Sequence, residues 1–315
     1  MDLSDTLVIG ISATALFDLK EADELFRSES NRELAIRKYR DYMLARENEP
    51  LKDGTAMPLV EALLHLNEQY QKEGEPPLVE VVIMSKNTPE TGLRVINTIR
   101  KKGLPITRYA FTGGEPVTDY LEAFDVDLFL TTDPAAAQSV IDSRRCAAAI
   151  VKEPPKEPAA PKEQVRIAFD GDAVLFDESS ELIYKRDGIK EFHRHEEEHS
   201  DVPLTEGPYA NFLKKLSRLQ ERLPMHIELT PIRIAIITAR SAPAEMRVIK
   251  TLRHWNVHVD EIFFLGGLDK SRVLKAFRPH IFFDDQEHHL KKAASVVPSG
   301  KVPYPSDSEI HRVTK

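Results

Sequence analysis

Residues 167–177 read IAFDGDAVLFD, an apolar segment that ends in two carboxylates two positions apart. Side chains at i and i+2 of a strand point to the same side, so Asp170 and Asp172 leave the strand together, and Gly171 lets a ligand approach the backbone. Open parallel sheets bind ligands at that carboxyl edge. Two neighbouring carboxylates repel each other unless a cation or a proton lies between them, which predicts a metal site or an acid/base pair.

Three further apolar segments follow, and each ends in residues that can carry chemistry. Residues 234–240 read IAIITAR, residues 261–267 read EIFFLGG, and residues 280–285 read HIFFDD. Helical patterns separate these segments, which indicates βαβ units, a parallel sheet and an α/β fold. Because crossovers are right-handed, the strand ends should meet at one edge of the sheet. The side chains expected there with the first acid pair are Thr238, Lys270, Asp284 and Asp285.

This set of side chains suits phosphoryl transfer. Carboxylates are the ligands that Mg²⁺ prefers, and the absence of Cys and His at these positions argues against zinc. Asp170 is the candidate nucleophile, which would form an aspartyl-phosphate. Asp172 would protonate the leaving oxygen and then activate the hydrolytic water. Lys270 and Thr238 are the candidate phosphate-binding residues. The candidate magnesium ligands are Asp170, Asp172, Asp284 and Asp285.

The order Asp-x-Asp, Thr, Lys and terminal acid pair resembles the haloacid dehalogenase superfamily of phosphohydrolases. Longer strings are similar to the cytosolic 5'-nucleotidase I family: FDGDAVLF at 169–176, TARSA at 238–242, PHIFFDDQ at 279–286, SATALFD at 12–18, RVIN at 94–97 and TGG at 112–114. The similarity covers nearly the whole chain. It implies a magnesium-dependent hydrolase of nucleoside 5'-monophosphates, with AMP as the family's usual substrate.

The chain also contains an internal repeat. An offset of 153 residues aligns Arg94-Val95-Ile96 with Arg247-Val248-Ile249 and Gly113-Gly114 with Gly266-Gly267, without a gap from about residue 49 to 132. With a small shift, residues 12–14 align with residues 170–172. The predicted fold is therefore a tandem pair of haloacid-dehalogenase-like Rossmannoid units with parallel sheets, covering residues 1–150 and 165–315.

The first copy has lost the residues that carry chemistry in the second. Ser12 and Thr14 replace the first acid pair, Val117 replaces the lysine, and Thr131-Thr132 replace the second acid pair, whereas Ser85 retains a hydroxyl. Without these carboxylates the copy cannot hold Mg²⁺ or form an acyl phosphate. We expect residues 1–150 to be a catalytically inactive scaffold, with anion binding by the hydroxyls as the alternative.

Composition supports a two-part protein that acts on small molecules. A length of 315 residues suggests two domains, and the proline-rich, charged residues 151–164 read as the linker between them. The net charge, 43 − 51 = −8, opposes generic nucleic-acid binding. A single cysteine, Cys146, the lack of a membrane-length apolar run and the lack of a secretory signal favour a cytoplasmic protein. A homo-oligomer is compatible with the sequence, which does not determine the oligomeric state.

An insert of about residues 178–233 separates the first two motifs of the second copy. We expect a small helical cap there, inserted after the first strand, whose second part places Phe212, Leu213, Leu216 and Leu219 on one helical face. By resemblance, such caps cover the site and select the substrate. The candidate substrate-binding residues are His193, His195 and Tyr209 in the insert and Arg240 after the second motif.

Three other functions compete with a nucleotidase. Residues 195–199 read HEEEH, which matches a zinc-protease pattern, but the surrounding sequence is polar on every side and favours a charged, solvated cap helix. A nucleotide-binding regulator with little turnover would fit the first copy, although the intact acid pair of the second argues against it for the whole chain. A phosphatase of another small phosphate ester would use the same catalytic residues.

Overall fold

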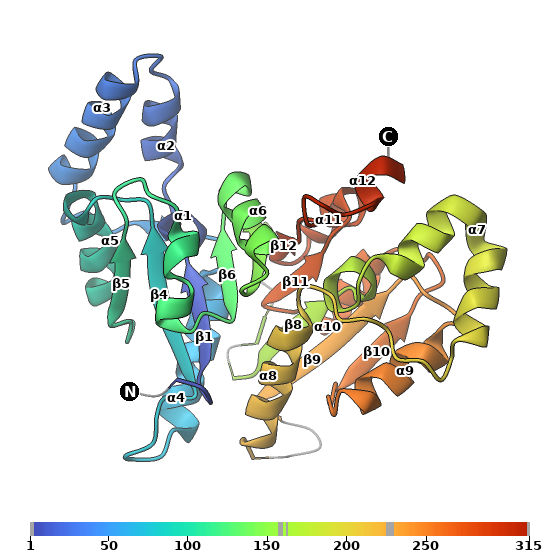
Figure 1. The fold of residues 1–315 in the computed structure, drawn as a ribbon. Helices are drawn as coiled ribbons and strands as arrows, with labels where there is room; N and C mark the ends of the chain where they lie inside the picture. The colour runs from blue at the N-terminus through green and yellow to red at the C-terminus, as the bar shows by residue number, and fades with distance from the viewer. Residues whose placement is uncertain (1–2, 157–159, 162, 225–229, 314–315) are drawn as a thin grey trace.

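One sheet runs through both halves of the chain in the computed structural model, which describes residues 3–156, 160–161, 163–224 and 230–313 (Figure 1). The order of its ten strands is β10-β9-β8-β11-β12-β7-β6-β1-β4-β5. Neighbours are parallel except β12 and β7, which confirms the predicted α/β class. The strands are β1 (Leu7–Ile11), β4 (Val79–Ser85), β5 (Arg108–Phe111), β6 (Leu128–Thr131), β7 (Ala147–Val151), β8 (Val165–Phe169), β9 (Ile232–Thr238), β10 (Glu261–Phe264), β11 (Ile281–Asp284) and β12 (Ser299–Lys301).

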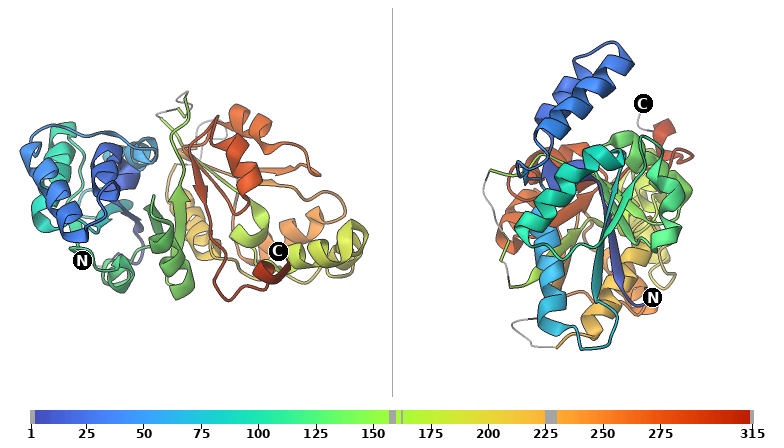
Figure 2. Two further views of the ribbon diagram at one scale, coloured as in Figure 1. Left: turned by 90° about the horizontal axis from the view of Figure 1, so that it is seen from above. Right: turned by 90° about the vertical axis from the view of Figure 1, so that its left-hand side faces the viewer.

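The two halves have the same strand order. Counted outwards from the antiparallel pair, the first half reads β7-β6-β1-β4-β5 and the second reads β12-β11-β8-β9-β10. Figure 2 shows the halves side by side along the sheet. Because β7 and β12 run in opposite directions, the strands of the two halves have their carboxyl ends at opposite edges. The edge that carries Asp170 therefore faces away from the edge that carries Ser12.

Helices connect the strands and pack on the sheet. Among the described residues, α4 contacts β4, α6 contacts β6 and β7, and α11 contacts β11 and β12. The helices are α1 (Ala13–Leu16), α2 (Lys20–Arg27), α3 (Arg32–Ala45), α4 (Met57–Tyr70), α5 (Pro89–Lys102), α6 (Pro134–Ser143), α7 (Ser179–Glu198), α8 (Ala210–Glu221), α9 (Glu245–His254), α10 (Lys270–Phe277), α11 (Glu287–Ala293) and α12 (Ile310–Val313). Short elements are β2 (Phe17–Asp18), β3 (Lys52–Asp53), η1 (Val117–Tyr120), η2 (Glu122–Phe124) and η3 (Gly171–Leu175).

The internal repeat extends to individual hydrogen bonds. Side-chain bonds in the first half recur between residues 153 positions later in the second half, with the same backbone partners. The recurring bonds are Leu51 N to Thr98 Oγ1 and Leu204 N to Thr251 Oγ1, Thr98 Oγ1 to Arg94 O and Thr251 Oγ1 to Arg247 O, and Asn67 Nδ2 to Val79 O and Gln220 Nε2 to Ile232 O. Because each bond needs a particular backbone geometry, the two halves share local structure as well as sequence.

Helix α8 lies in the core and does not form part of a cap. Its apolar side chains, including Phe212, are buried, and the helix contacts η3 of its own half and β1 of the other half. Tyr209, just before α8, has no exposed surface, and its ring centroid lies 4.8 Å from that of Phe283. The Tyr209 ring also packs against Phe169 and Phe212, so its surroundings are those of an apolar core residue and give no support to the predicted role in substrate binding.

Helix α7 stands out from the second half of the molecule (Figure 1). Gly188 has φ 81° and ψ 178°, a conformation that favours glycine, and it divides the helix into two arms. The arms meet where Ser180 Oγ donates a 2.9 Å hydrogen bond to Glu196 Oε1, sixteen residues later. Since α8 packs on the sheet, we restrict the proposed cap to about residues 178–205.

Two expectations about the chain as a whole concern its linker and its membrane segments. Part of the proposed linker, residues 157–159 and 162, lies outside the described residues. Residues 1–150 and 165–315 share one continuous sheet, and their separation into two domains remains a prediction.

No helix in the described part of the chain is long and apolar enough to span a bilayer.

Candidate active site

Three side chains from separate elements form the centre of the site. Asp170 follows β8, Asp284 ends β11, and Lys270 is the first residue of α10. Lys270 Nζ lies 2.8 Å from Asp170 Oδ2 and 2.7 Å from Asp284 Oδ2. All three residues are buried. The structure thus brings one acid of each predicted pair, Asp170 and Asp284, together with Lys270 at one sheet edge.

The electrostatics of this cluster follow from burial and from the opposite charges. Burial raises the pKa of Asp170 to about 7, and the neighbouring Asp284 carboxylate adds to the rise while Lys270 opposes it. Burial alone would lower the pKa of Lys270, but the two carboxylates raise it above its ordinary value. The lysine therefore stays charged. A further cation beside Asp170 would favour the ionised carboxylate that a nucleophile requires.

Thr238 lies against the loop that carries Asp170. It ends β9, is buried, and its Oγ1 accepts a 3.2 Å hydrogen bond from the backbone N–H of Arg240. A Cβ added to Gly171 would lie 3.3 Å from this oxygen, which is tighter than an ordinary contact. Glycine at this position therefore allows the Asp-x-Asp loop to approach the hydroxyl closely, as a shared phosphate site would need.

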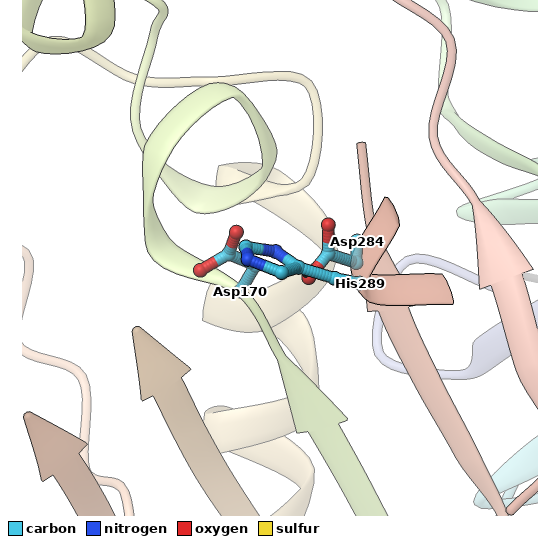
Figure 3. Close-up of side chains that lie close together, drawn as sticks. All are labelled: Asp170, Asp284 and His289. Carbon is cyan, nitrogen blue, oxygen red and sulfur yellow. The ribbon is translucent and has the colours of Figure 1, made fainter. Parts of the chain in front are cut away.

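His289 is a residue of the site that the sequence pattern did not single out. One ligand atom from each of Asp170, Asp284 and His289 lies within 4.8 Å of the others, and Figure 3 shows the imidazole close to both carboxylates. Its Nδ1 is 3.2 Å from Asp284 Oδ2, yet it is buried and makes no hydrogen bond within the described residues. The signal was available in the sequence, because His289 follows Asp285 by four residues, in the helix that begins at Glu287.

The side chain of Asp172 points to a different partner. Arg240 Nε and Nη2 donate to its two carboxylate oxygens at 2.8 and 2.6 Å, which is a bidentate pair. The Arg240 side chain is 2% exposed and that of Asp172 is 18% exposed. A buried arginine therefore holds the Asp-x-Asp loop at Asp172. Arg240, which the sequence suggested as a substrate-binding residue, contacts a catalytic candidate.

Asp285 is also turned away from the central cluster. Its Oδ2 accepts a hydrogen bond from the Tyr304 hydroxyl, and its Oδ1 is buried without a partner among the described residues. Burial, together with the charges of Asp284, Asp170 and Glu181, raises the pKa of Asp285 well above its usual range. Glu181, on α7, likewise has one buried oxygen without a hydrogen bond within the described residues. The two adjacent acids of the last motif thus have different environments.

Comparison with known proteins matches nearly the whole chain. A family model described as 5'-nucleotidase matches residues 1–309. The chain belongs to the 5'-nucleotidase family. Cytosolic 5'-nucleotidase 1B of Homo sapiens is 36% identical over 294 residues, which are 92% of this chain and 47% of that protein, so the chain spans about half the length of this relative. The structure of a Pnkp1/Rnl/Hen1 complex aligns over 96% of this chain and 97% of that chain at 12% identity with a TM-score of 0.32, a likeness too weak to support an argument.

In this member of the 5'-nucleotidase family, the geometry of the HEEEH segment, residues 195–199, differs from that of a zinc site. The rings of His195 and His199 stack with centroids 4.2 Å apart, and His199 Nδ1 lies 2.8 Å from the carbonyl oxygen of His195. Glu196 between them is completely buried, which differs from the solvated helix that the polar sequence favours. The nitrogen Nε2 of His193 is buried without a hydrogen-bond partner in the described part of the chain.

Proposed function

We propose that the chain hydrolyses nucleoside 5'-monophosphates such as AMP to a nucleoside and phosphate. The observation that supports this most directly is the buried carboxylate of Asp170, which Lys270 holds beside Asp284 at the carboxyl edge of the sheet. Membership of the 5'-nucleotidase family supports the substrate class. The name of the human relative supports a cytosolic location.

The proposed reaction has two steps. Asp170 attacks phosphorus, a bond forms between its carboxylate oxygen and phosphorus, and the bond from phosphorus to the 5'-oxygen breaks. Asp172 enters this step protonated, gives its proton to that leaving oxygen and becomes a carboxylate. The carboxylate then takes a proton from the water that attacks phosphorus, and the bond between phosphorus and Asp170 breaks. Lys270 and the Thr238 hydroxyl hold the phosphoryl oxygens while negative charge develops on them.

The site also suits a divalent cation, for which Mg²⁺ is our proposal. The carboxylates of Asp170 and Asp284 are buried, lie close together and offer the hard oxygen ligands that Mg²⁺ prefers. His289 Nδ1 lies in the same cluster, so the sequence argument that no histidine accompanies these carboxylates does not hold, and the choice of Mg²⁺ rests on the two carboxylates. A bound cation would offset the charge of the phosphoryl group. Asp172 and Asp285, the other two predicted ligands, have their carboxylates on Arg240 and Tyr304.

Phosphate release from a panel of monophosphates tests the proposed function. We expect hydrolysis of AMP and related 5'-monophosphates by full-length protein, loss of that activity in excess chelator and its return with Mg²⁺. Ribose 5-phosphate and glycerol phosphate serve as small esters without a base. Faster hydrolysis of these esters than of any nucleotide would instead indicate a phosphatase of another substrate class. Nucleotide binding without phosphate release would indicate a regulatory protein.

The two acids of the last motif should differ in their effect on the metal. Asp284→Asn removes a candidate ligand, so we expect the Mg²⁺ concentration for half-maximal rate to rise at least about tenfold. Asp285→Asn is the matched control. Because the Asp285 carboxylate contacts Tyr304 and not the central cluster, an isosteric amide should change that concentration by less than about threefold. The measurement is the rate of phosphate release as a function of Mg²⁺ concentration, with protein from which metal has been removed. Equal shifts of the half-maximal Mg²⁺ concentration in both variants would refute the assignment of Asp284 as a metal ligand.

We further propose that the first half has no catalytic activity of its own. Its counterparts of the catalytic carboxylates are hydroxyls, and Thr132 Oγ1 donates a 2.6 Å hydrogen bond to Thr14 Oγ1. Hydroxyls bonded to each other offer neither a carboxylate nucleophile nor anionic ligands. The half would then serve as a scaffold, which its share of the common sheet supports.

A further inference from the structure

A continuous series of charged contacts connects the cap to the Asp-x-Asp loop. Arg240 holds both carboxylate oxygens of Asp172 through Nε and Nη2, and its remaining nitrogen, Nη1, donates to Glu196 Oε2 on α7. The side chain of Glu196 is 0% exposed and that of Arg240 is 2% exposed. Arg240 therefore has one carboxylate from the catalytic loop and one from the cap.

Glu196 is itself held firmly on its other side. Its Oε1 accepts hydrogen bonds of 2.9 Å from Arg247 Nη1 on α9 and from Ser180 Oγ on the other arm of α7. Burial alone would raise the pKa of Glu196, but the two arginines and the serine hold it below its usual range. A buried, ionised carboxylate with this many donors gives Arg240 a rigid anchor.

The first half provides an internal comparison that separates a structural contact from a functional one. Arg247 Nε donates to the backbone carbonyl of Val202 at 2.9 Å, at the end of the cap. At the 153-residue offset, Arg94 Nε donates to the carbonyl of Glu49 at 3.1 Å. This arginine contact is therefore present in both halves, whether or not the half carries catalytic carboxylates, which indicates a role in the fold.

The contacts between Asp172, Arg240 and Glu196 occur in the second half alone. The counterpart of Glu196 is Met43, whose Sδ lies 3.9 Å from Arg94 Nη1, and the counterpart of Arg240 is Asn87. The helices that carry Glu196 and Met43 end at equivalent positions, Glu198 and Ala45. The half without an acid at the Asp172 position thus also lacks the arginine and the buried glutamate, although its fold is retained.

We propose that Glu196 is a positioning residue for Asp172: it fixes Arg240, and Arg240 in turn fixes the side chain of Asp172, which enters the step protonated and gives its proton to the leaving 5'-oxygen. This inference rests on the proposed function. A carboxylate that can rotate spends little time within hydrogen-bond reach of the leaving oxygen, and about 1 Å of displacement is enough to slow such a step greatly. The cap thereby takes part in catalysis without touching the reacting atoms.

The leaving group distinguishes this role from a structural one. When Asp170 attacks AMP, the departing alkoxide needs a proton, whereas the phenolate released from p-nitrophenyl phosphate leaves without one. We therefore compare release of adenosine and of p-nitrophenol in a single turnover with protein in excess, so that the shared hydrolysis of the aspartyl-phosphate does not contribute. The variants are Glu196→Gln and, as a control, Glu197→Gln, which changes an exposed neighbour on the same helix.

In Glu196→Gln we expect the maximal rate of adenosine release to fall at least about tenfold, because correct placement of a general acid contributes that much or more. In the same variant, the protein concentration that gives half the maximal rate and the rate of p-nitrophenol release should each change less than about threefold. In Glu197→Gln, the rates of release of both leaving groups should also change less than about threefold. Equal loss with both esters would show that Glu196 is structural and overturn the proposal. Unchanged adenosine release would overturn it as well.

A second variant tests the same role with residues that are compatible with the local fold. Glu196→Met combined with Arg240→Asn copies the residues of the first half, where the same local fold is stable, and should give the same selective loss of adenosine release. Wild-type protein that releases neither leaving group would refute the proposed function itself. An active wild type with an unselective double variant would refute the positioning role alone.

Discussion

Asp170→Asn lowers phosphate release from AMP by at least about a thousandfold, because an amide cannot serve as the covalent nucleophile. The protein should remain folded. Asparagine has nearly the same shape, and Lys270 keeps its 2.7 Å contact with Asp284, so no buried charge is left without a partner. The measurement is steady-state phosphate release at saturating AMP and Mg²⁺, together with the melting temperature of each variant.

Two controls make this result decisive. Asp187→Asn removes an exposed carboxylate from the cap and should leave the rate unchanged. Mass spectrometry of the Asp170→Asn protein excludes deamidation back to aspartate. A folded Asp170→Asn variant with more than about a tenth of the wild-type rate cannot use Asp170 as its nucleophile, and the aspartyl-phosphate route would be abandoned.

The second large effect concerns separation of the two halves. Residues 165–315 alone should be insoluble or unfolded at 25 °C, because the sheet and the core are shared. Without the first half, β12 becomes an open edge, and the apolar face of α8 loses its contact with β1. Each large apolar side chain that becomes exposed costs roughly 1.5–3 kcal/mol, so a few of them approach the whole stability of a domain.

The matched control is the full-length protein cleaved between its two halves, which remain associated. A protease site placed within residues 157–162 allows cleavage after folding, and the cleaved protein should keep its rate and its chromatographic size while the halves stay associated. Circular dichroism, melting temperature and AMP hydrolysis compare it with residues 165–315 expressed alone. Full activity and an unchanged melting temperature of residues 165–315 would show that the first half is an independent module and not a scaffold.

Local sequence patterns determine the strands and the catalytic cluster. The apolar segments that end in Asp170, Thr238 and Asp284 form neighbouring parallel strands, and Lys270 begins α10, the helix just before the last of them in the chain. These positions follow from strand alternation and from the right-handed connection of parallel strands, both of which operate over a few tens of residues. The internal repeat was visible in the sequence for the same reason, since equivalent local structures need equivalent residues.

Partner choice and burial depend on contacts between distant parts of the chain, and these only the tertiary structure decided. Glu196 lies in a polar run that indicates a solvated helix, yet the fold of α7 at Gly188 places it between Arg240 and Arg247. Its alignment with Met43, an apolar residue, was the one sequence signal that the position is buried. The assignment of α8 and Tyr209 to the core, like the joining of two sheets through β12 and β7, likewise follows from packing that no local periodicity encodes.

The residue pairs within each motif show the same division between sequence and structure. Asp284 and Asp285 are adjacent and chemically identical in sequence, but Asp284 is the last residue of β11 and Asp285 lies just beyond it, and one meets Lys270 whereas the other meets Tyr304. Asp172 was recognisable as a partner of Asp170, whereas its arginine comes from another strand end, 68 residues away. The sequence thus determined which residues can carry the chemistry, and the tertiary structure decided which charges they meet, because electrostatic contacts act through space and not along the chain.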